Sequence, residues 1–402
     1  MESSIRPILD KALAGDLLSL EEGYRLIECD GPELDFLVET AGLLRDRFKG
    51  RTVTYSRKIF LPVTNLCRDR CAYCTFRKSP GEPGAWTMTP TEIEHALELG
   101  SLQGCKEALM CLGDKPELAF PQYRKTLAEF GHRTTAEYVL HACEIAAERG
   151  FLPHTNAGIL SYDEMKLLKP YNASLGLMLE NVSPRLSSKG MAHFSAPDKR
   201  PAVRLRMLRE AGELSIAFTT GILIGIGETR REIVDSLMAI RRLHETYGHI
   251  QEVIIQNFRA KPDTRMAECA EPDSVDMART VAVARLIFGG TMNIQVPPNL
   301  NPNDHRLMLR AGINDWGGIS PVTKDYINPE AAWPHIETLA ETCRQEGFTL
   351  RERLAVYEEY IDRPSFLSDQ MRPLVLKLQG EVSGSVPQSV SANSVSCAPS
   401  AD

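Results

Sequence analysis

The chain has 402 residues, of which 43% are hydrophobic, 25% charged and 7% aromatic, with 28 glycines and 25 prolines. These fractions are ordinary for a globular protein, and the length allows two or three domains, or one α/β barrel of about 250 residues with extensions. Forty-six basic residues against 53 acidic ones give a net charge of −7. No overall positive field therefore draws the chain to nucleic acid or to an anionic membrane.

Targeting signals are the next feature to look for. No apolar run approaches the ~18 residues that cross a bilayer, and residues 1–6 lack the basic-then-apolar pattern of a secretory signal. We therefore expect a cytoplasmic protein without a membrane partner, in which thiols stay reduced. Ten cysteines in 402 residues are too few for a disulfide scaffold, but three of them lie close together.

The first fifty residues are predicted to be helical. Ser19 precedes the acidic pair Glu21 and Glu22 and an apolar-periodic stretch, as at a helix start. A second periodic stretch covers residues 34–48. We interpret residues 1–50 as a helical lead that packs on the outside of a larger unit.

From about Lys58, short apolar runs alternate with longer helical patterns, which indicates βα units and a parallel sheet. The expected strands are residues 59–64, 108–112, 152–156, 173–179, 219–226, 252–257 and 292–296, with a weaker eighth at 312–319. The expected helices between them include residues 91–99, 135–150, 202–212, 230–247 and 274–288. Seven or eight such repeats favour a (β/α)8 barrel of the TIM type over an open nucleotide-binding sheet.

We assign residues 51–300 to the core barrel and residues 301–380 to its completion and a C-terminal extension. Residues 381–402 contain seven serines and no aromatic or basic residue. That composition is typical of a disordered tail. Cys397 lies in this tail, and we expect no chemical role for it.

Cys67, Cys71 and Cys74 follow the first predicted strand with the spacing Cys-x3-Cys-x2-Cys. Thiolates are soft ligands suited to iron–sulfur clusters, zinc and copper(I). A structural zinc site normally has four protein ligands, and no histidine lies within ten residues of the motif. A 4Fe–4S cluster held by three cysteines would keep one iron open, as catalytic metal sites do. A zinc site with a remote fourth ligand, or three buried cysteines in a turn, remain alternatives at this point.

The pattern Cys-x3-Cys-x-aromatic-Cys after the first barrel strand resembles the radical S-adenosylmethionine (SAM) superfamily, with Tyr73 as the aromatic residue. The resemblance implies that the three cysteines hold one 4Fe–4S cluster, whose open iron binds the amino and carboxylate groups of SAM. It also implies that an electron from the cluster cleaves SAM to methionine and a 5′-deoxyadenosyl radical. That radical takes a hydrogen atom from the substrate.

Further segments carry the same resemblance. Residues 111–117 (CLGDKPE) end the second strand, where the superfamily has a glycine-rich turn at the cofactor's amino group, and Glu180 ends the fourth, where a carboxylate would bind ribose hydroxyls. Residues 221–228 (GILIGIGE) resemble the motif G-x-I-x-G-x-x-E, with Leu223 in place of the usual isoleucine. Arg204 is a candidate partner for the cofactor carboxylate. The cofactor-binding residues implied in this way are Tyr73, Gly113, Asp114, Lys115, Glu117, Glu180, Arg204 and Gly225.

Four segments are more specific: GDKPE (113–117), QNFRAKP (256–262), DWGGISPV (315–322) and GFTLRERL (347–354). They resemble the cyclising subunit of 7,8-didemethyl-8-hydroxy-5-deazariboflavin synthase, and the match runs from about Tyr55 to Ile361. The resemblance implies a lyase acting on the adduct of a tyrosine-derived 4-hydroxybenzyl group and a ribitylamino-uracil, 5-amino-5-(4-hydroxybenzyl)-6-(D-ribitylimino)-5,6-dihydrouracil. Radical chemistry closes the central ring of the deazaflavin and releases ammonia.

The resemblance also implies partners. One cysteine triad and room for one barrel imply a separate sister enzyme, a radical SAM 4-hydroxybenzyl transferase that makes the adduct upstream. Reduction of the cluster implies a flavodoxin- or ferredoxin-type reductant.

Polar side chains at strand ends are the candidates for substrate contact, because a ribityl chain and a uracil edge need many hydrogen bonds. They are His154 and Asn156 after the third strand, Gln256, Asn257 and Arg259 after the sixth, and Asn299 and Asn303 after the seventh. Each of them could equally cap a helix or satisfy a loop backbone. The sequence identifies no acid or base for ammonia release.

Two other functions remain open at this point. A sulfur-inserting reaction of the biotin synthase kind would need a second cluster, for which Cys105, Cys111 and Cys143 are available without close ligand spacing. A non-catalytic, zinc-stabilised binding protein would explain the cysteine triad, but not the glycine-rich strand ends or the acidic Glu180 and Glu228.

Overall fold

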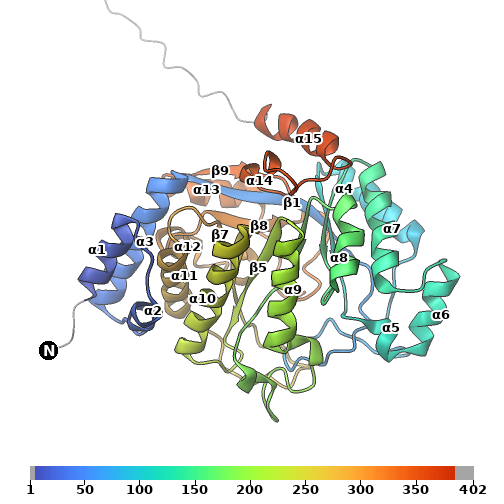
Figure 1. Ribbon diagram of the computed structural model, residues 1–402, viewed down its shortest axis with the longest axis horizontal. Helices are drawn as coiled ribbons and strands as arrows, with labels where there is room; N and C mark the ends of the chain where they lie inside the picture. Colours follow the sequence, from blue (N-terminus) through green and yellow to red (C-terminus); the bar gives the residue numbers. More distant parts are fainter. Residues whose placement is uncertain (1–4, 385–402) are drawn as a thin grey trace, which may run out of the picture.

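Eight parallel strands form a ring at the centre of the molecule (Figure 1). The structure is a computed structural model, and it describes residues 5–384. The strands are β1 (Thr52–Pro62), β2 (Glu107–Cys111), β3 (Leu152–Asn156), β4 (Ser174–Gly176), β5 (Phe218–Ile224), β6 (Ile250–Asn257), β7 (Ile294–Gln295) and β8 (Asp315–Ile319). They follow one another around the ring in chain order, and β1 closes it by pairing with both β2 and β8. The predicted (β/α)8 barrel is confirmed.

The strand register brings several loops to one rim of the barrel. Pro62 at the end of β1 pairs with Cys111 at the end of β2, and Cys111 pairs with Asn156 at the end of β3. Ile224 and Asn257 end β5 and β6 as a further pair. Because all these strands are parallel, the loops that follow them meet at the carboxyl end of the barrel, where barrel active sites lie.

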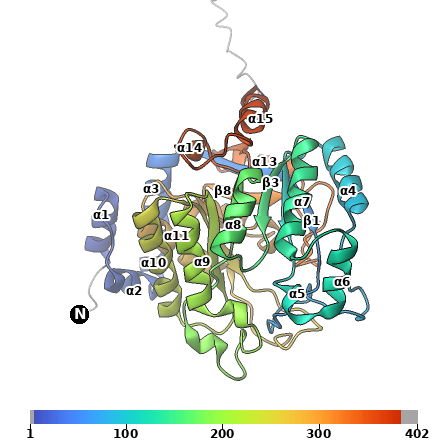
Figure 2. The same ribbon diagram turned by 45° about the vertical axis from the view of Figure 1, so that its right-hand side comes forward.

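The helices between the strands cover the outside of the ring (Figures 1 and 2). They are α4 (Pro90–Leu102), α5 (Pro116–Ala119), α6 (Pro121–Glu129), α7 (Thr135–Glu148), α8 (Tyr162–Leu168), α9 (Pro201–Glu213), α10 (Arg230–Tyr247), α11 (Ser274–Phe288) and α12 (His305–Arg310). Short 3-10 turns lie at Lys169–Tyr171, Pro184–Ser187, Pro197–Lys199 and Pro298–Leu300. Capping boxes, in which a Ser or Thr and a Glu three residues later satisfy each other's backbone N–H, fix the start of α4, α7, α8 and α10.

Three helices precede the barrel: α1 (Arg6–Ala14), α2 (Leu20–Ile27) and α3 (Pro32–Lys49). Ser19 and Glu22 form a capping box at the start of α2. α3 packs on α11, and α2 packs on α10 and α11. The approach of α2 to α10 is close, because a Cβ added at Gly23 would lie 2.7 Å from Val234 Cγ1.

The chain from α13 onward covers the amino end of the barrel. It contains α13 (Ile336–Gln345), β9 (Thr349–Glu352), α14 (Glu358–Ile361) and α15 (Arg372–Gly384). β9 pairs with the first residues of β1, whose later residues pair with β2. α14 and α15 lie at the end of the barrel opposite α5 and α6 (Figures 1 and 2).

An apolar layer that includes Leu354, Val356 and Val375 joins this segment to the barrel. Val382 also packs against the layer. α15 therefore runs through Gly384, four residues beyond the expected boundary of the tail. The rest of the expected tail, residues 385–402 with Cys397, lies outside the described residues. Between residues 5 and 384, no helix is both long and apolar enough to span a membrane.

Candidate active site

A cavity of about 340 Å³ extends from the carboxyl-end rim into the barrel. Cys67, Cys71 and Cys74 line one wall of it. Phe60 and Trp333 also line it, and their rings stack with centroids 5.3 Å apart. The cavity thus joins the cysteine motif after β1 to the loop after β8.

The cysteine loop is held by backbone hydrogen bonds to two other segments. The N–H of Arg70 donates to Ser195 O at 2.9 Å, and the N–H of Ala72 donates to Ala192 O at 2.9 Å. The backbone N–H of Asp114, after β2, donates to Cys67 Sγ at 3.1 Å. The position of the loop is therefore set by the chain after β2 and by the chain before α9.

Gly113 explains why the turn after β2 needs a glycine. A Cβ at this position would lie 2.0 Å from Leu66 O and 2.7 Å from Cys67 Cβ. No side chain can be accommodated there unless the backbone of the cysteine loop moves. The segment CLGDKPE thus lies directly against the cysteine motif.

The three thiols suit a metal cluster better than a single ion. Within residues 5–384, the group of possible ligand atoms that lie within 4.8 Å of one another is Asp69, Asp114 and Asp198, and does not include the three cysteines. Zn–S bonds of about 2.3 Å would bring sulfur ligands to roughly 4 Å from one another. At least one pair of the three Sγ atoms therefore lies more than 4.8 Å apart, which leaves room for a larger cluster between them.

Burial keeps the thiols of Cys67 and Cys71 protonated until a cation is bound. It raises the pKa of Cys67 to about 12, and it raises the pKa of Cys71 well above its ordinary value. Metal binding requires thiolates and supplies the positive charge that stabilises them. The residues present therefore fit a 4Fe–4S cluster.

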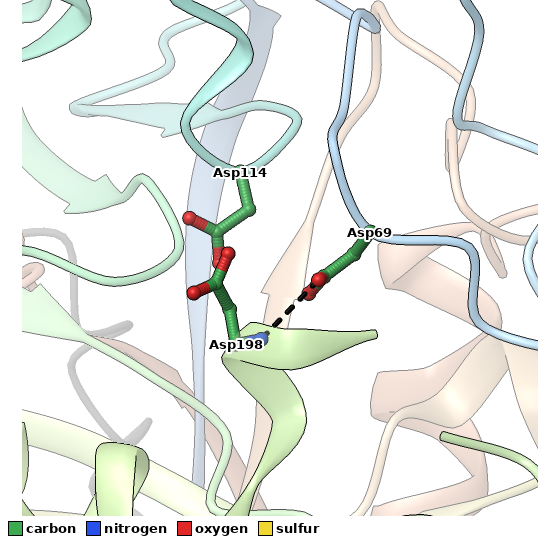
Figure 3. A group of neighbouring side chains, drawn as sticks. All are labelled: Asp69, Asp114 and Asp198. Atoms are coloured by element: carbon green, nitrogen blue, oxygen red, sulfur yellow. Dashed lines mark hydrogen bonds between the residues drawn. The ribbon is translucent and has the colours of Figure 1, made fainter. Parts of the chain in front are cut away.

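Asp69 of the cysteine loop meets Asp114 and Asp198, which come from two other segments (Figure 3). The backbone N–H of Asp198 donates to Asp69 Oδ1 at 3.3 Å, and the N–H of Ile159 donates to Asp114 Oδ2 at 3.1 Å. Burial and the neighbouring carboxylates raise the pKa of Asp69 to about 6 and that of Asp114 to about 7. Arg68 pairs with Asp198. The result is a buried acidic corner next to the cysteines.

Glu180 is the centre of a buried polar network on the same wall. Its carboxylate accepts hydrogen bonds from Tyr73 Oη at 2.6 Å and from His193 Nε2 at 3.0 Å, and it contacts Lys199. Burial alone would raise the pKa of Glu180, but Lys199, His193 and Arg204 outweigh it and hold the pKa well below its usual value. Its φ of 64° is unusual for a non-glycine residue, so the surrounding contacts hold the backbone in a strained conformation.

Of the cofactor-binding candidates, Tyr73, Gly113, Asp114, Glu180 and Arg204 line the cavity. Arg204 donates from Nε to Asp198 O at 3.1 Å and also contacts Met178 O. The turn after β2, the segment after β4 and the first turn of α9 thus all reach the cavity.

Lys115, Glu117 and Gly225 lie elsewhere. Lys115 pairs with Glu164, and Glu117 accepts a 2.6 Å hydrogen bond from Thr135 Oγ1 at the start of α7. The N–H of Gly225 donates to the Glu228 carboxylate at 2.6 Å, and a Cβ at Gly225 would lie 2.5 Å from Pro272. The contacts of these three residues hold loops and helix ends in place.

Among the substrate candidates, His154, Asn156, Gln256 and Asn299 line the cavity. The other three do not.

Asn257 donates to Leu300 O at 3.3 Å and accepts from Asn301 at 3.0 Å. Arg259 is 37% exposed and pairs with Glu271 at 2.9 Å. Asn303 is exposed at the surface. Residues distant in the chain thus occupy the side chains of Asn257 and Arg259. Residue type alone could not show that these partners exist.

Several cavity residues were not expected from the sequence. Lys58, Glu107 and Gln295 lie deep in the barrel, and Phe60 and Trp333 lie nearer its mouth. Lys58 and Glu107 stand directly before two of the expected strands, and a charged residue next to an apolar run could have marked each of them. Trp333 lies in the loop after β8 and carried no such signal.

The cysteines considered for a second cluster do not gather. Cys143 is buried at a hydrogen-bond distance from Thr155 and Asn172, and Cys105 is buried in the apolar core. Cys111 lines the cavity, but the other two do not.

Comparison with known proteins agrees with this geometry. The Radical SAM superfamily model matches residues 61–240. The 7,8-didemethyl-8-hydroxy-5-deazariboflavin synthase of Methanopyrus kandleri is 50% identical over 312 residues, which cover 77% of this chain and 93% of that protein. FO synthase of Mycobacterium tuberculosis (strain H37Rv) is 44% identical over 400 residues, covering 95% of this chain and 47% of that protein. The chain therefore spans about half the length of the FO synthases that it matches.

Solved structures show the same fold. HydG, a maturase of the FeFe-hydrogenase, superposes with a TM-score of 0.74 at 16% identity, covering 93% of this chain and 80% of that one. Methylornithine synthase (PylB) superposes with a TM-score of 0.66 at 18% identity, covering 85% and 96%. The relatives' names agree with the predicted deazaflavin chemistry and give no support to sulfur insertion or to a zinc-stabilised binding protein. By its sequence and its site, the chain belongs to the 7,8-didemethyl-8-hydroxy-5-deazariboflavin synthase family of radical SAM enzymes.

Proposed function

We propose that this protein cyclises the adduct of a 4-hydroxybenzyl group and a ribitylamino-uracil to 7,8-didemethyl-8-hydroxy-5-deazariboflavin, with release of ammonia. The observation that carries the proposal is the match over 93% of a deazariboflavin synthase. The described chain has one barrel and one cysteine triad at its rim. One barrel of this kind fits one of the two radical reactions of deazaflavin synthesis, and a sister transferase supplies the adduct.

Cys67, Cys71 and Cys74 are the residues that would hold the 4Fe–4S cluster. Their free thiols share one wall of the cavity, and the N–H of Asp114 already donates to Cys67 Sγ. When bound, the cluster and SAM supply the hydrogen-atom abstraction that starts the reaction. A flavodoxin- or ferredoxin-type protein is the reductant we expect.

The polar wall beside the cysteines would orient SAM through charge. Asp69 and Asp114 provide carboxylates suited to an ammonium group, and the Arg204 guanidinium is suited to a carboxylate. Glu180 would accept hydrogen bonds from ribose hydroxyls, because Lys199 and Arg204 keep it ionised. Tyr73 links Glu180 to the cysteine motif and fixes its position.

The remaining polar residues of the cavity would bind the substrate. The side-chain amides of Asn156 and Gln256 have no hydrogen-bond partner among the described residues, so both are free for a ligand. Burial lowers the pKa of His154 to about 4. The imidazole is therefore neutral at pH 7 and can donate or accept one hydrogen bond.

The test is turnover by the cluster-loaded, reduced protein with SAM. Supplied with the synthetic adduct, it should form fluorescent deazaflavin, 5′-deoxyadenosine and ammonia. Supplied with tyrosine and the ribitylamino-uracil, it should form deazaflavin only when the sister transferase is added. Deazaflavin formed without the transferase, or none formed from the adduct, would overturn the proposal.

A cysteine pair gives the matched control. Cys71→Ala should abolish the brown chromophore and product formation. Cys269→Ala, at an exposed thiol outside the motif, should change neither.

Since all nine described cysteines are free thiols, we also infer a reducing, cytoplasmic location.

A further inference from the structure

Two glycines of β8 shape the floor of the cavity. A Cβ at Gly318 would lie 1.6 Å from Lys58 Cε, and a Cβ at Gly317 would lie 2.0 Å from Gln295 Nε2. Any larger residue would displace these two side chains. The segment DWGGISPV thus lets Lys58 from β1 and Gln295 from β7 lie flat against β8, and both line the cavity.

Lys58 and Gln295 have hydrogen-bonding capacity that the protein does not use. The Lys58 ammonium lies 2.8 Å from Glu107 Oε1, and this is its one ion-pair partner within residues 5–384. An ammonium has three N–H donors. The Gln295 residue is only 6% exposed, and its side-chain amide bonds to none of the described residues. Neither group is among the fully enclosed polar atoms without a partner, so both open onto the cavity, where a ligand can supply the missing bonds.

The adjacent ion cluster is different, because its members satisfy one another. Arg353 Nε lies 2.6 Å from Asp315 Oδ2, and Arg353 Nη2 lies 3.0 Å from Glu252 Oε1. Thr219 Oγ1 donates to Glu252 Oε2 at 3.1 Å. This cluster closes the amino end of the barrel. Gln295 is in register with Asp315 and Lys58 lies four residues beyond Thr54, which also pairs with Asp315, and both have donors to spare.

The order of residues along β1 indicates which part of a ligand reaches the floor. Lys58 lies four residues before the end of the strand, roughly 13 Å below the rim. Phe60, two residues further on, faces the same cavity and stacks on Trp333. The cysteine motif follows the strand. From floor to mouth, the cavity therefore offers the hydrogen-bonding groups of Lys58 and Gln295, then the aromatic rings of Phe60 and Trp333, and then the cysteine motif.

We propose that Lys58 and Gln295, laid flat by Gly317 and Gly318, bind the ribityl chain of the substrate and so select a polyol-bearing pyrimidine. This inference rests on the proposed function. The ribityl chain takes no part in ring closure or ammonia loss, so it can serve as an anchor away from the reacting atoms. Its hydroxyls both donate and accept, as an ammonium beside a carboxylate and a primary amide require. The planar rings then lie beside Phe60 and Trp333, between the floor of the cavity and the cysteine motif.

The test is equilibrium binding to the cluster-loaded protein without reductant, followed by deazaflavin fluorescence. The two probes are the ribityl-bearing deazaflavin product and the same ring system with a methyl group in place of the chain. The unaltered protein should prefer the ribityl compound at least tenfold, because each hydrogen bond contributes roughly fivefold.

Three variants separate recognition from folding. Gln295→Met has almost the same shape and removes no protein hydrogen bond. The double variant Lys58→Met/Glu107→Gln removes both charges together, so no buried charge is left unpaired. Gly318→Ala leaves Lys58 chemically intact but displaces it. Gln122→Met, on an exposed face of α6, is the matched control and should keep the full preference.

Each of the three variants should lower the ribityl preference about fivefold and leave binding of the methyl compound unchanged. Retention of the preference by both Gln295→Met and the double variant would overturn the inference. The proposed function would still stand in that case, because the unaltered protein would bind the product and make it from the adduct. Failure of the unaltered protein to do either would instead remove the proposed function.

Discussion

Replacing Arg353 by methionine should destabilise the barrel at its amino end. The guanidinium is buried and bonds to Asp315, Glu252 and the carbonyl of Leu354. Removing one partner of a buried ion pair costs about 3–5 kcal/mol, because it leaves uncompensated charge. Unfolding of about 380 residues has an entropy of about 0.8 kcal/mol per kelvin at roughly 2.1 cal/mol/K per residue. The melting temperature should therefore fall by about 4–6 °C.

The loss should depend on pH, with a definite sign. Burial and Asp315 raise the pKa of Glu252 to about 7 even with Arg353 present. A carboxyl whose pKa is raised in the folded protein binds a proton more tightly in the folded state than in the unfolded state. Its contribution to the free energy of unfolding is therefore lost as the pH rises from the unfolded-state pKa to the folded-state pKa. Without Arg353 the pKa of Glu252 rises further, so the variant should lose more stability at pH 8 than at pH 6.

Thermal unfolding followed by circular dichroism at both pH values is the assay. Arg351→Met is the matched control. Arg351 lies in β9, two residues before Arg353, is 42% exposed and pairs with the exposed Glu358 at 3.4 Å. An exposed pair contributes about 0–1 kcal/mol, so this variant should melt within about 1 °C of the parent. If Arg353→Met melted with the parent at pH 8, the ion cluster would not be what holds the end of the barrel closed.

Three further outcomes follow from the site. Gly113→Ala should prevent cluster reconstitution, measured as iron per chain, because its Cβ would collide with the backbone of Leu66; a normal iron content would disprove the contact. Glu180→Gln should weaken SAM binding to the cluster-loaded protein by about tenfold or more, since a hydrogen bond to a charged group contributes about 1.5–3 kcal/mol, whereas Glu117→Gln, outside the cavity, should bind SAM normally in the same titration. Burial raises the pKa of Glu107, but Lys58, His154 and Arg353 outweigh it and lower the pKa to about 2. The ionised Glu107 should therefore contribute about 3 kcal/mol to the free energy of unfolding above pH 4.5, and this contribution should be lost as the pH falls toward 2. Acid unfolding of Lys58→Met/Glu107→Gln should lack this component, and an unchanged acid profile would contradict it.

Much of the fold could be predicted because the barrel repeats a strongly periodic unit. The bounds expected for α10 and α11 are those observed, since each combines an N-cap with a long apolar face. β1 begins seven residues earlier than expected, because its first half alternates polar and apolar residues. β9 was missed, because Thr349–Glu352 has no apolar run and is a strand only by pairing with β1.

Site residues could be identified from the sequence where a short motif contains them, and not where their role depends on residues distant in the chain. The motif of eight residues that contains Cys67, Cys71 and Cys74 is recognisable in the sequence, and all three cysteines line the cavity. Asn257 has the same residue type as the free Asn156, yet a contact with Asn301 occupies it. Gln295 becomes part of the cavity floor through Gly317, a residue from another strand. No pattern along the chain carries that information.

The closed amino end of the barrel bears on the sequence of binding events. Within the described residues, the Arg353 cluster and the apolar layer beneath it close the floor of the cavity. Ligands therefore enter and leave at the rim, at the carboxyl ends of the strands. A molecule that reaches Lys58 has to enter before the space above it is filled, and it leaves only after that space is cleared. Under the proposed binding mode, a substrate held at Lys58 would therefore bind before SAM and leave after it.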